Sequence, residues 1–61
     1  MKRRDLLQHL IYNNCQILRE GRSHSILENT ANQKLTSIPR QREIPTFTVF
    51  KICKQLEVPE P

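Results

Sequence analysis

Apolar residues recur along this chain with two different periods, and that change of period is the feature that most constrains the fold. Near both ends of the chain they recur at spacings of three and four residues, which is the pattern of an amphipathic helix. Between these regions apolar and polar residues alternate in short runs, which is the pattern of a half-buried strand. The sequence therefore predicts a helix near each end and strands between them.

Two helices are predicted, over Arg3–Asn13 and over Thr46–Leu56. The residues that each helix would bury are Leu6, Leu7, Leu10 and Ile11 in the first and Val49, Ile52, Cys53 and Leu56 in the second. Thr46 or Thr48 has the side chain to cap the second helix. The prolines after Val58 end that helix.

Three strands are predicted, and they are Cys15–Glu20, Ser23–Glu28 and Lys34–Ile38. In the first strand, simple alternation places Arg19 on the same face as Cys15. Gly21 is the only glycine, and we expect it to take a positive φ in a tight turn between the first two strands. Residues 29–33 form a loop, and residues 39–45 form a polar connector rich in arginine.

The predicted order, α-β-β-β-α, defines an α+β fold. Three antiparallel strands would offer one apolar face, which both helices must cover, so the other face of the sheet stays open. A functional site would have to be built on that open face. We expect one domain over residues 1–58, followed by a short tail, residues 59–61.

A chain of 61 residues buries little surface, and a core of this size rarely supplies more than roughly 3–5 kcal/mol. Disulfides, metals and partner chains are the usual remedies. Cys15 and Cys53 lack a secretory context and indicate reduced thiols, and with His9 and His24 they form no paired metal-ligand spacing. We therefore expect no metal and no cofactor. No apolar stretch suits a signal peptide or a membrane span, so we expect a cytoplasmic protein. By elimination, a partner chain would supply the extra stability.

The charge indicates contact with nucleic acid. Ten Lys and Arg residues oppose six Asp and Glu residues, giving a net charge of +4. Such a surface attracts phosphate backbones, although it would also serve simply to keep a small protein in solution. One glycine cannot make a glycine-rich phosphate loop, and three aromatic residues offer no platform for stacked bases.

His24 is the residue best suited to chemistry. It follows the glycine by three positions, between Ser23 and Ser25, at the start of a strand. A histidine exchanges protons near neutral pH, and a base that removes the 2′-hydroxyl proton of RNA creates an internal nucleophile without a metal. A structural histidine in a hairpin fits the local pattern equally well, and alternation alone does not decide which face of the strand is buried. His9, on a polar helix face, indicates an ordinary surface histidine.

Three runs of the sequence, Lys2–Leu7, Leu18–Ile26 and Ile38–Ile44, match a known pattern in the same order along the chain. In these runs the chain resembles the HicA family of bacterial type II toxins, which cleave mRNA. The resemblance implies a fold like the double-stranded-RNA-binding domain, His24 as the catalytic histidine, and a HicB-type antitoxin that covers the active face in a hetero-oligomer. The side chains we then expect to contact RNA are Arg22, Ser23, Ser25, Lys34, Arg40 and Arg42.

Three positions depart from the family pattern. Gln41 replaces a histidine found in many relatives, so it cannot act as a second acid or base. Leu27 stands where an aromatic residue is common. The segment Pro45–Thr48 opens the last helix where relatives often have a lysine–glycine pair, and its Phe47 is either an antitoxin contact or a staple onto the core. These departures leave a second hypothesis, a non-catalytic RNA-binding module of the same fold. A DNA-binding helix-turn-helix is disfavoured by the strand-like middle of the chain.

Overall fold

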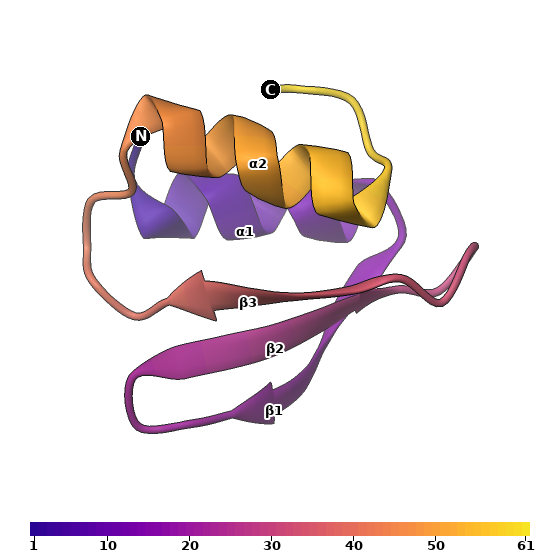
Figure 1. The fold of residues 1–61 in the computed structure, drawn as a ribbon, viewed down its shortest axis with the longest axis horizontal. Coiled ribbons are helices and arrows are strands. Elements are labelled where there is room, and N and C mark those ends of the chain that lie inside the picture. Colours follow the sequence, from indigo (N-terminus) through magenta and orange to yellow (C-terminus); the bar gives the residue numbers. More distant parts are fainter.

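The computed structural model describes residues 1–61 and has the predicted order of elements (Figure 1). The elements are α1 (Arg3–Tyr12), β1 (Cys15–Glu20), β2 (His24–Asn29), β3 (Leu35–Pro39) and α2 (Thr46–Leu56). The strands form one antiparallel sheet in the order β1-β2-β3. The α+β class and the α-β-β-β-α order are confirmed.

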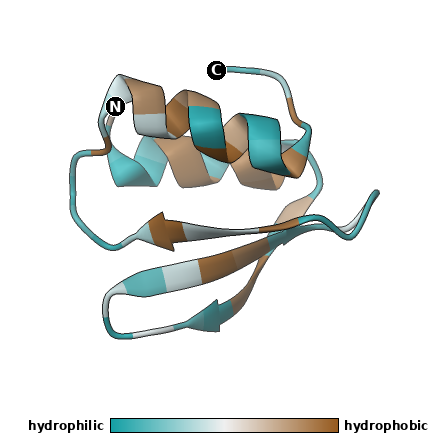
Figure 2. Ribbon diagram, viewed as in Figure 1, coloured by the Kyte–Doolittle hydropathy of each residue, from teal (hydrophilic) through white to brown (hydrophobic).

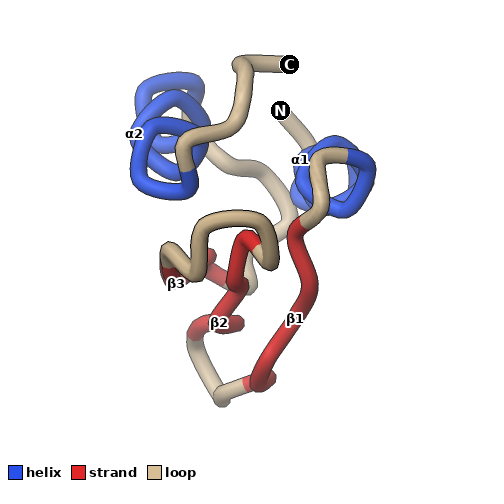
Figure 3. Tube along the Cα trace, turned by 90° about the vertical axis from the view of Figure 1, so that its right-hand side faces the viewer, coloured by secondary structure: helices blue, strands red, loops and turns tan.

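The molecule has two layers. Both helices lie on one side of the sheet, with α1 above β1 and α2 above β3 (Figure 3). Hydrophobic segments occur in both helices and in the strands, whereas most of the loop between β3 and α2 is hydrophilic (Figure 2). The buried core lies between the layers and consists of Leu6, Leu10, Cys15, Leu27, Ile38, Ile44, Val49, Ile52, Cys53 and Leu56.

In α1, Leu6 and Leu10 are buried and Leu7 packs against the core at its margin. The predicted burial of Ile11 is wrong, because 55% of its surface is exposed. Ile11 stands one position from Leu10, and successive residues of a helix point about 100° apart, so only part of the predicted stripe faces the sheet. Asn14, with a φ of 72°, turns the chain from α1 into β1.

In α2, all four residues predicted to be buried are buried. The predicted threonine cap is wrong, because Pro45 occupies the cap position and no side chain caps the helix. Ile44 and Val49, both in the core, stand at the two positions of a hydrophobic staple, which fixes the entry of the helix instead. Phe47 is 73% exposed, so the alternative in which it staples the helix onto the core is wrong.

The central strand settles which face of the sheet is open. Ser25, Leu27 and Asn29 are buried beneath the helices. Because neighbouring residues of a strand point to opposite faces, His24 lies on the open face, where it is exposed. Leu27 is therefore a core residue on the side away from His24, and its departure from the family pattern concerns packing in the core.

A β-bulge in β1 changes the faces of its last residues. Ile17 pairs with Leu27, but Arg19 pairs with Ile26, so Leu18 is an extra residue without a partner. The extra residue moves Arg19 to the open face and Glu20 to the helix face, where it pairs with Ser25. The prediction that Arg19 shares a face with Cys15 is therefore wrong.

The cysteines, the C-terminal tail and the length of the helices complete the description of the fold. Cys15 and Cys53 are free and buried, and burial raises the pKa of both thiols. Val58 packs against the core, and the ring of His9 hydrogen-bonds the carbonyl of Pro59 at 2.6 Å, so α1 holds the start of the tail. Neither helix has the length and apolar character that crossing a membrane requires.

Candidate functional site

His24 begins β2 directly after the hairpin loop, residues 21–23, at the end of the sheet near the start of both helices (Figure 1). Its carbonyl accepts a 2.7 Å hydrogen bond from the amide of Gly21, which closes the loop. Arg40 braces the loop from the end of β3: its amide donates to the carbonyl of Ser23 at 3.0 Å, and its Nη1 donates to that of Gly21 at 3.1 Å. The backbone of His24 is thus fixed, while its imidazole makes no hydrogen bond within the chain and faces solvent.

Gly21 has a different role from the predicted one. Its φ is not positive, so the turn does not use the left-handed region. The structure requires glycine because a Cβ at this position would stand 2.8 Å from the carbonyl oxygen of His24. That oxygen belongs to the backbone, which has no flexible end to move aside.

We predict that Gly21→Ala strains the hairpin that carries His24. Relieving an overpacked contact typically costs about 1–3 kcal/mol, here with displacement of the His24 carbonyl. The free energy of unfolding in urea measures the loss. Ala31→Gly, in an exposed loop at the other end of the sheet, is the control. Wild-type stability in Gly21→Ala would show that the close approach does not matter.

A polar cluster lies beneath the hairpin on the helix face. Arg3, from α1, donates from Nε to the carbonyl of Pro39 at 3.1 Å and from Nη2 to the Ser25 hydroxyl at 2.6 Å. The hydroxyl of Ser25 in turn donates to the carboxylate of Glu20. The Oε1 atom of Glu20 lies 3.6 Å from Nη2 of Arg3 and 3.6 Å from Nη1 of Arg40. The hydrogen bond from Ser25 and the charges of Arg40 and Arg3 lower the pKa of Glu20, so the carboxylate form that holds this cluster is favoured.

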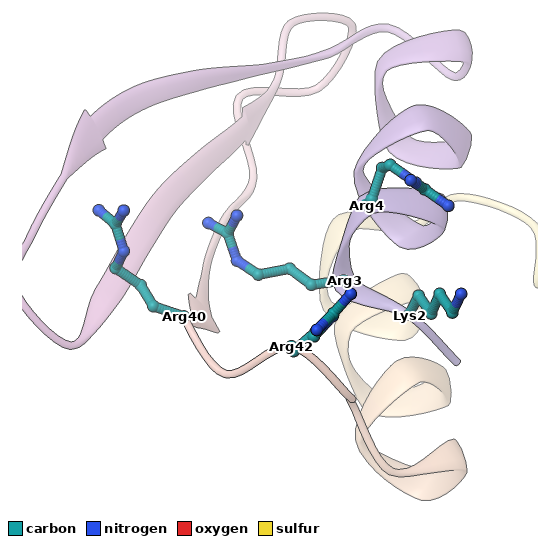
Figure 4. A pocket seen from close by; sticks show the side chains of 5 residues that line it. All are labelled: Lys2, Arg3, Arg4, Arg40 and Arg42. Atoms are coloured by element: carbon teal, nitrogen blue, oxygen red, sulfur yellow. The ribbon is translucent and has the colours of Figure 1, made fainter.

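Five basic side chains surround a hollow of about 340 Å3 beside this cluster. The lining residues of this cationic hollow are Lys2, Arg3, Arg4, Arg40 and Arg42. They come from the start of α1 and from the connector that follows β3 (Figure 4). No apolar side chain and no carboxylate lines the hollow.

Backbone contacts between distant parts of the chain create the cationic hollow. Residues 1–3 run alongside the connector: the amide of Arg3 donates to the carbonyl of Arg42, and the amide of Ile44 donates to that of Met1, both at 2.8 Å. Lys2 forms an isolated antiparallel bridge with Glu43. These contacts place the basic start of α1 against the arginines of the connector.

The structure brings some of the predicted RNA-contacting residues together and separates others. Arg40 and Arg42 line the cationic hollow, and Arg22 and Ser23 are exposed in the hairpin loop. Ser25 is fully buried, so its hydroxyl positions Arg3 and Glu20 and is not available to RNA in this structure. Lys34 precedes β3 at the opposite end of the sheet.

Four further basic residues belong to the candidate site, and sequence reasoning did not assign them to it. They are Lys2, Arg3, Arg4 and Arg19. The run of three basic residues at the start of α1 is the available signal for the first three. Arg19 carries no such signal, because only the bulge at Leu18 brings it to the face of His24.

The fold and this site define a class. A small basic α+β domain with two helices on one face of a three-stranded antiparallel sheet is consistent with the double-stranded-RNA-binding type of fold. The family model described as "HicA toxin of bacterial toxin-antitoxin" matches residues 3–58, which is nearly the whole chain. The chain belongs to this family of toxins of toxin–antitoxin systems. Searches of curated proteins and of solved structures gave no significant match.

Proposed function

We propose that this toxin is an endoribonuclease that cleaves mRNA without a metal ion and uses His24 as its catalytic residue. One observation carries the proposal: the imidazole of His24 is exposed on the open face of the sheet, on a hairpin that Arg40 holds in place. Membership of the HicA family supports the same assignment. The site of action would be the cytoplasm, where mRNA is found.

The proposed reaction needs one proton acceptor. A ring nitrogen of His24 takes the proton of a ribose 2′-hydroxyl, and the 2′-oxygen then attacks the adjacent phosphorus. The bond from phosphorus to the 5′-oxygen breaks, that oxygen takes a proton from solvent, and a 2′,3′-cyclic phosphate remains. Positioned acid–base help of this kind contributes roughly 10²- to 10⁴-fold. DNA lacks the 2′-hydroxyl and cannot follow this route.

Arginines near His24 would offset the negative charge that builds on the phosphorus oxygens. Arg19 is a diagonal cross-strand neighbour of His24 on the open face, and such neighbours lie roughly 7–8 Å apart at Cα, within reach of a long side chain. Arg22 lies in the adjoining loop and is exposed. Arg40 and Arg42 would contact RNA from the connector, and Ser23 from the loop. Lys34 would contact RNA only if the RNA strand ran along the sheet to its opposite end.

A HicB-type antitoxin would neutralise the toxin by covering the open face. Leu18 and Leu35, 49% and 54% exposed, lie on β1 and β3 and offer apolar contacts to such a partner. Phe47 is a further candidate contact. A chain of this size, with 13 buried residues, would gain stability from the added burial in a hetero-oligomer.

A second function, RNA binding without cleavage, is favoured by one observation. Gln41 is exposed and donates from its amide to the carbonyl of Glu43 at 3.0 Å, and an amide cannot protonate a leaving group. The site has no other histidine, since His9 contacts the tail. A protein limited to binding would protect RNA without shortening it.

One experiment separates the two functions. The purified chain is incubated with a single-stranded RNA and with a DNA of the same sequence, with and without EDTA. We expect cleavage of the RNA alone, undiminished by EDTA, and growth arrest on expression that a co-expressed neighbouring antitoxin gene relieves. Intact RNA that is nevertheless bound would establish the binding module, and cleavage abolished by EDTA would establish a metal-dependent reaction.

A further inference from the structure

We infer that the cationic hollow is a second RNA contact, which holds a backbone phosphodiester of an RNA strand that also passes His24. The inference rests on the proposed function only in taking RNA as the ligand. It concerns the helix side of the sheet, whereas His24 lies on the open side. Lys2, Arg3 and Arg4 would thereby join the binding machinery.

Charge in the hollow is only partly neutralised by the protein. Glu20 pairs with Arg3 and with Arg40, and Arg4 pairs with its sequence neighbour Asp5 at 3.7 Å. Lys2 and Arg42 have no carboxylate within 4.0 Å, and their side chains make no hydrogen bond within the chain. The hollow therefore presents an excess of positive charge to an incoming anion.

Arg3 is the pre-organised member of the hollow. Its side chain is only 18% exposed, and the carbonyl of Pro39 and the hydroxyl of Ser25 hold its guanidinium on two nitrogens. The remaining nitrogen, Nη1, has no acceptor in the chain. A guanidinium already fixed in place loses little freedom when it binds, which lowers the cost of forming the contact. Its planar donors match the oxygens of a phosphate.

The lining indicates a phosphate and not a base or a peptide. A volume of about 340 Å3 exceeds the volume of one water molecule in the liquid, about 30 Å3, roughly tenfold, so a phosphodiester fits together with ordered water. Bases and most peptide side chains bind against hydrophobic or aromatic side chains, and no such side chain lines the hollow. An acidic protein segment would match the charge but would leave unexplained why the hollow adjoins the hairpin of His24.

Two arginines connect the hollow to that hairpin. Arg40 lines the hollow and also donates to the carbonyl of Gly21 in the loop before His24. Arg3 lines the hollow and also donates to Ser25, the residue after His24. An RNA strand that lies at His24 on the open face would pass the exposed Arg22, round the end of the sheet and reach the hollow on the helix side. Because phosphate contacts fix the register of a nucleic acid, the hollow would help set which phosphodiester lies at His24.

The test measures RNA binding apart from cleavage. In the His24→Ala background, which keeps RNA intact, the double variant Lys2→Gln with Arg42→Gln removes the two unpaired charges. Its matched control, Lys51→Gln with Lys54→Gln, removes two exposed charges from α2. Binding of a short fluorescent single-stranded RNA is followed by anisotropy at several salt concentrations. We expect weaker binding for the hollow variant and a salt slope smaller by about 0.7 for each phosphate that is no longer neutralised, with the control unchanged.

Four outcomes would overturn the inference. An unchanged slope in the hollow variant, equal weakening in both double variants, or no RNA binding by the parent protein would each exclude a phosphate site in the hollow. A variant that keeps RNA binding and loses only antitoxin binding would assign the hollow to the protein partner. If binding depends on the hollow but the chain with His24 intact cleaves no RNA, the proposed catalytic function fails and the hollow stands.

Discussion

Replacing His24 with alanine should lower the rate of RNA cleavage by about 10²- to 10⁴-fold, because the reaction loses its only proton acceptor. The imidazole is exposed and makes no hydrogen bond within the chain, so its removal should change the free energy of unfolding by no more than about 0.5 kcal/mol. Cleavage of a labelled RNA under single-turnover conditions, beside a thermal unfolding curve, measures both quantities. Growth arrest on expression should disappear with the cleavage.

The chain offers its own matched control, because it has one other histidine. His9→Ala removes the hydrogen bond between the ring and the carbonyl of Pro59 but touches nothing at the hairpin. This variant should keep full activity. If both variants cleave RNA as the wild type does, His24 has no part in the reaction.

The order of elements could be predicted from the sequence because apolar spacing reports it directly. The spacing of Val49, Ile52, Cys53 and Leu56 brings all four side chains to one face only in a helix, and all four are buried. Local sequence patterns predict less well how a helix begins, because its first turn also packs against residues of the preceding segment. Local preference favours a threonine cap for α2, but the chain instead buries Ile44 just before the helix, which no local preference indicates.

The details of the candidate site were harder to predict, because they depend on register and on contacts distant in sequence. One extra residue at Leu18 exchanges the faces of Arg19 and Glu20. That exchange puts a cation beside His24 and a carboxylate beneath the hairpin, where it meets Arg3. The cationic hollow likewise exists only because residues 1–3 run alongside residues 42–44. The bulge has no signal in a single sequence, and the basic run Lys2–Arg4 indicates charge but not the contact with the connector that creates the hollow.

The largest effect on stability is expected from Leu27→Ala. Leu27 lies in the middle of the central strand, paired with Ile17 on one side and Thr36 on the other, and none of its surface is exposed. Truncating a buried leucine typically costs about 2–5 kcal/mol, from reduced burial and the cavity left behind. A core of this size supplies only roughly 3–5 kcal/mol in total. The variant should therefore be largely unfolded at room temperature.

Leu35→Ala is the matched control, since the same atoms are removed from a side chain that is 54% exposed. It should cost less than about 0.5 kcal/mol. Far-UV circular dichroism with urea titration measures both variants, and a folded Leu27→Ala would show that the helices repack over the gap. A partner that binds only the folded toxin adds about 2.7 kcal/mol at a concentration one hundred times its Kd. The cognate antitoxin should therefore restore part of the folded population of Leu27→Ala. The free energy gained on binding is comparable to the free energy of unfolding that the truncated side chain removes.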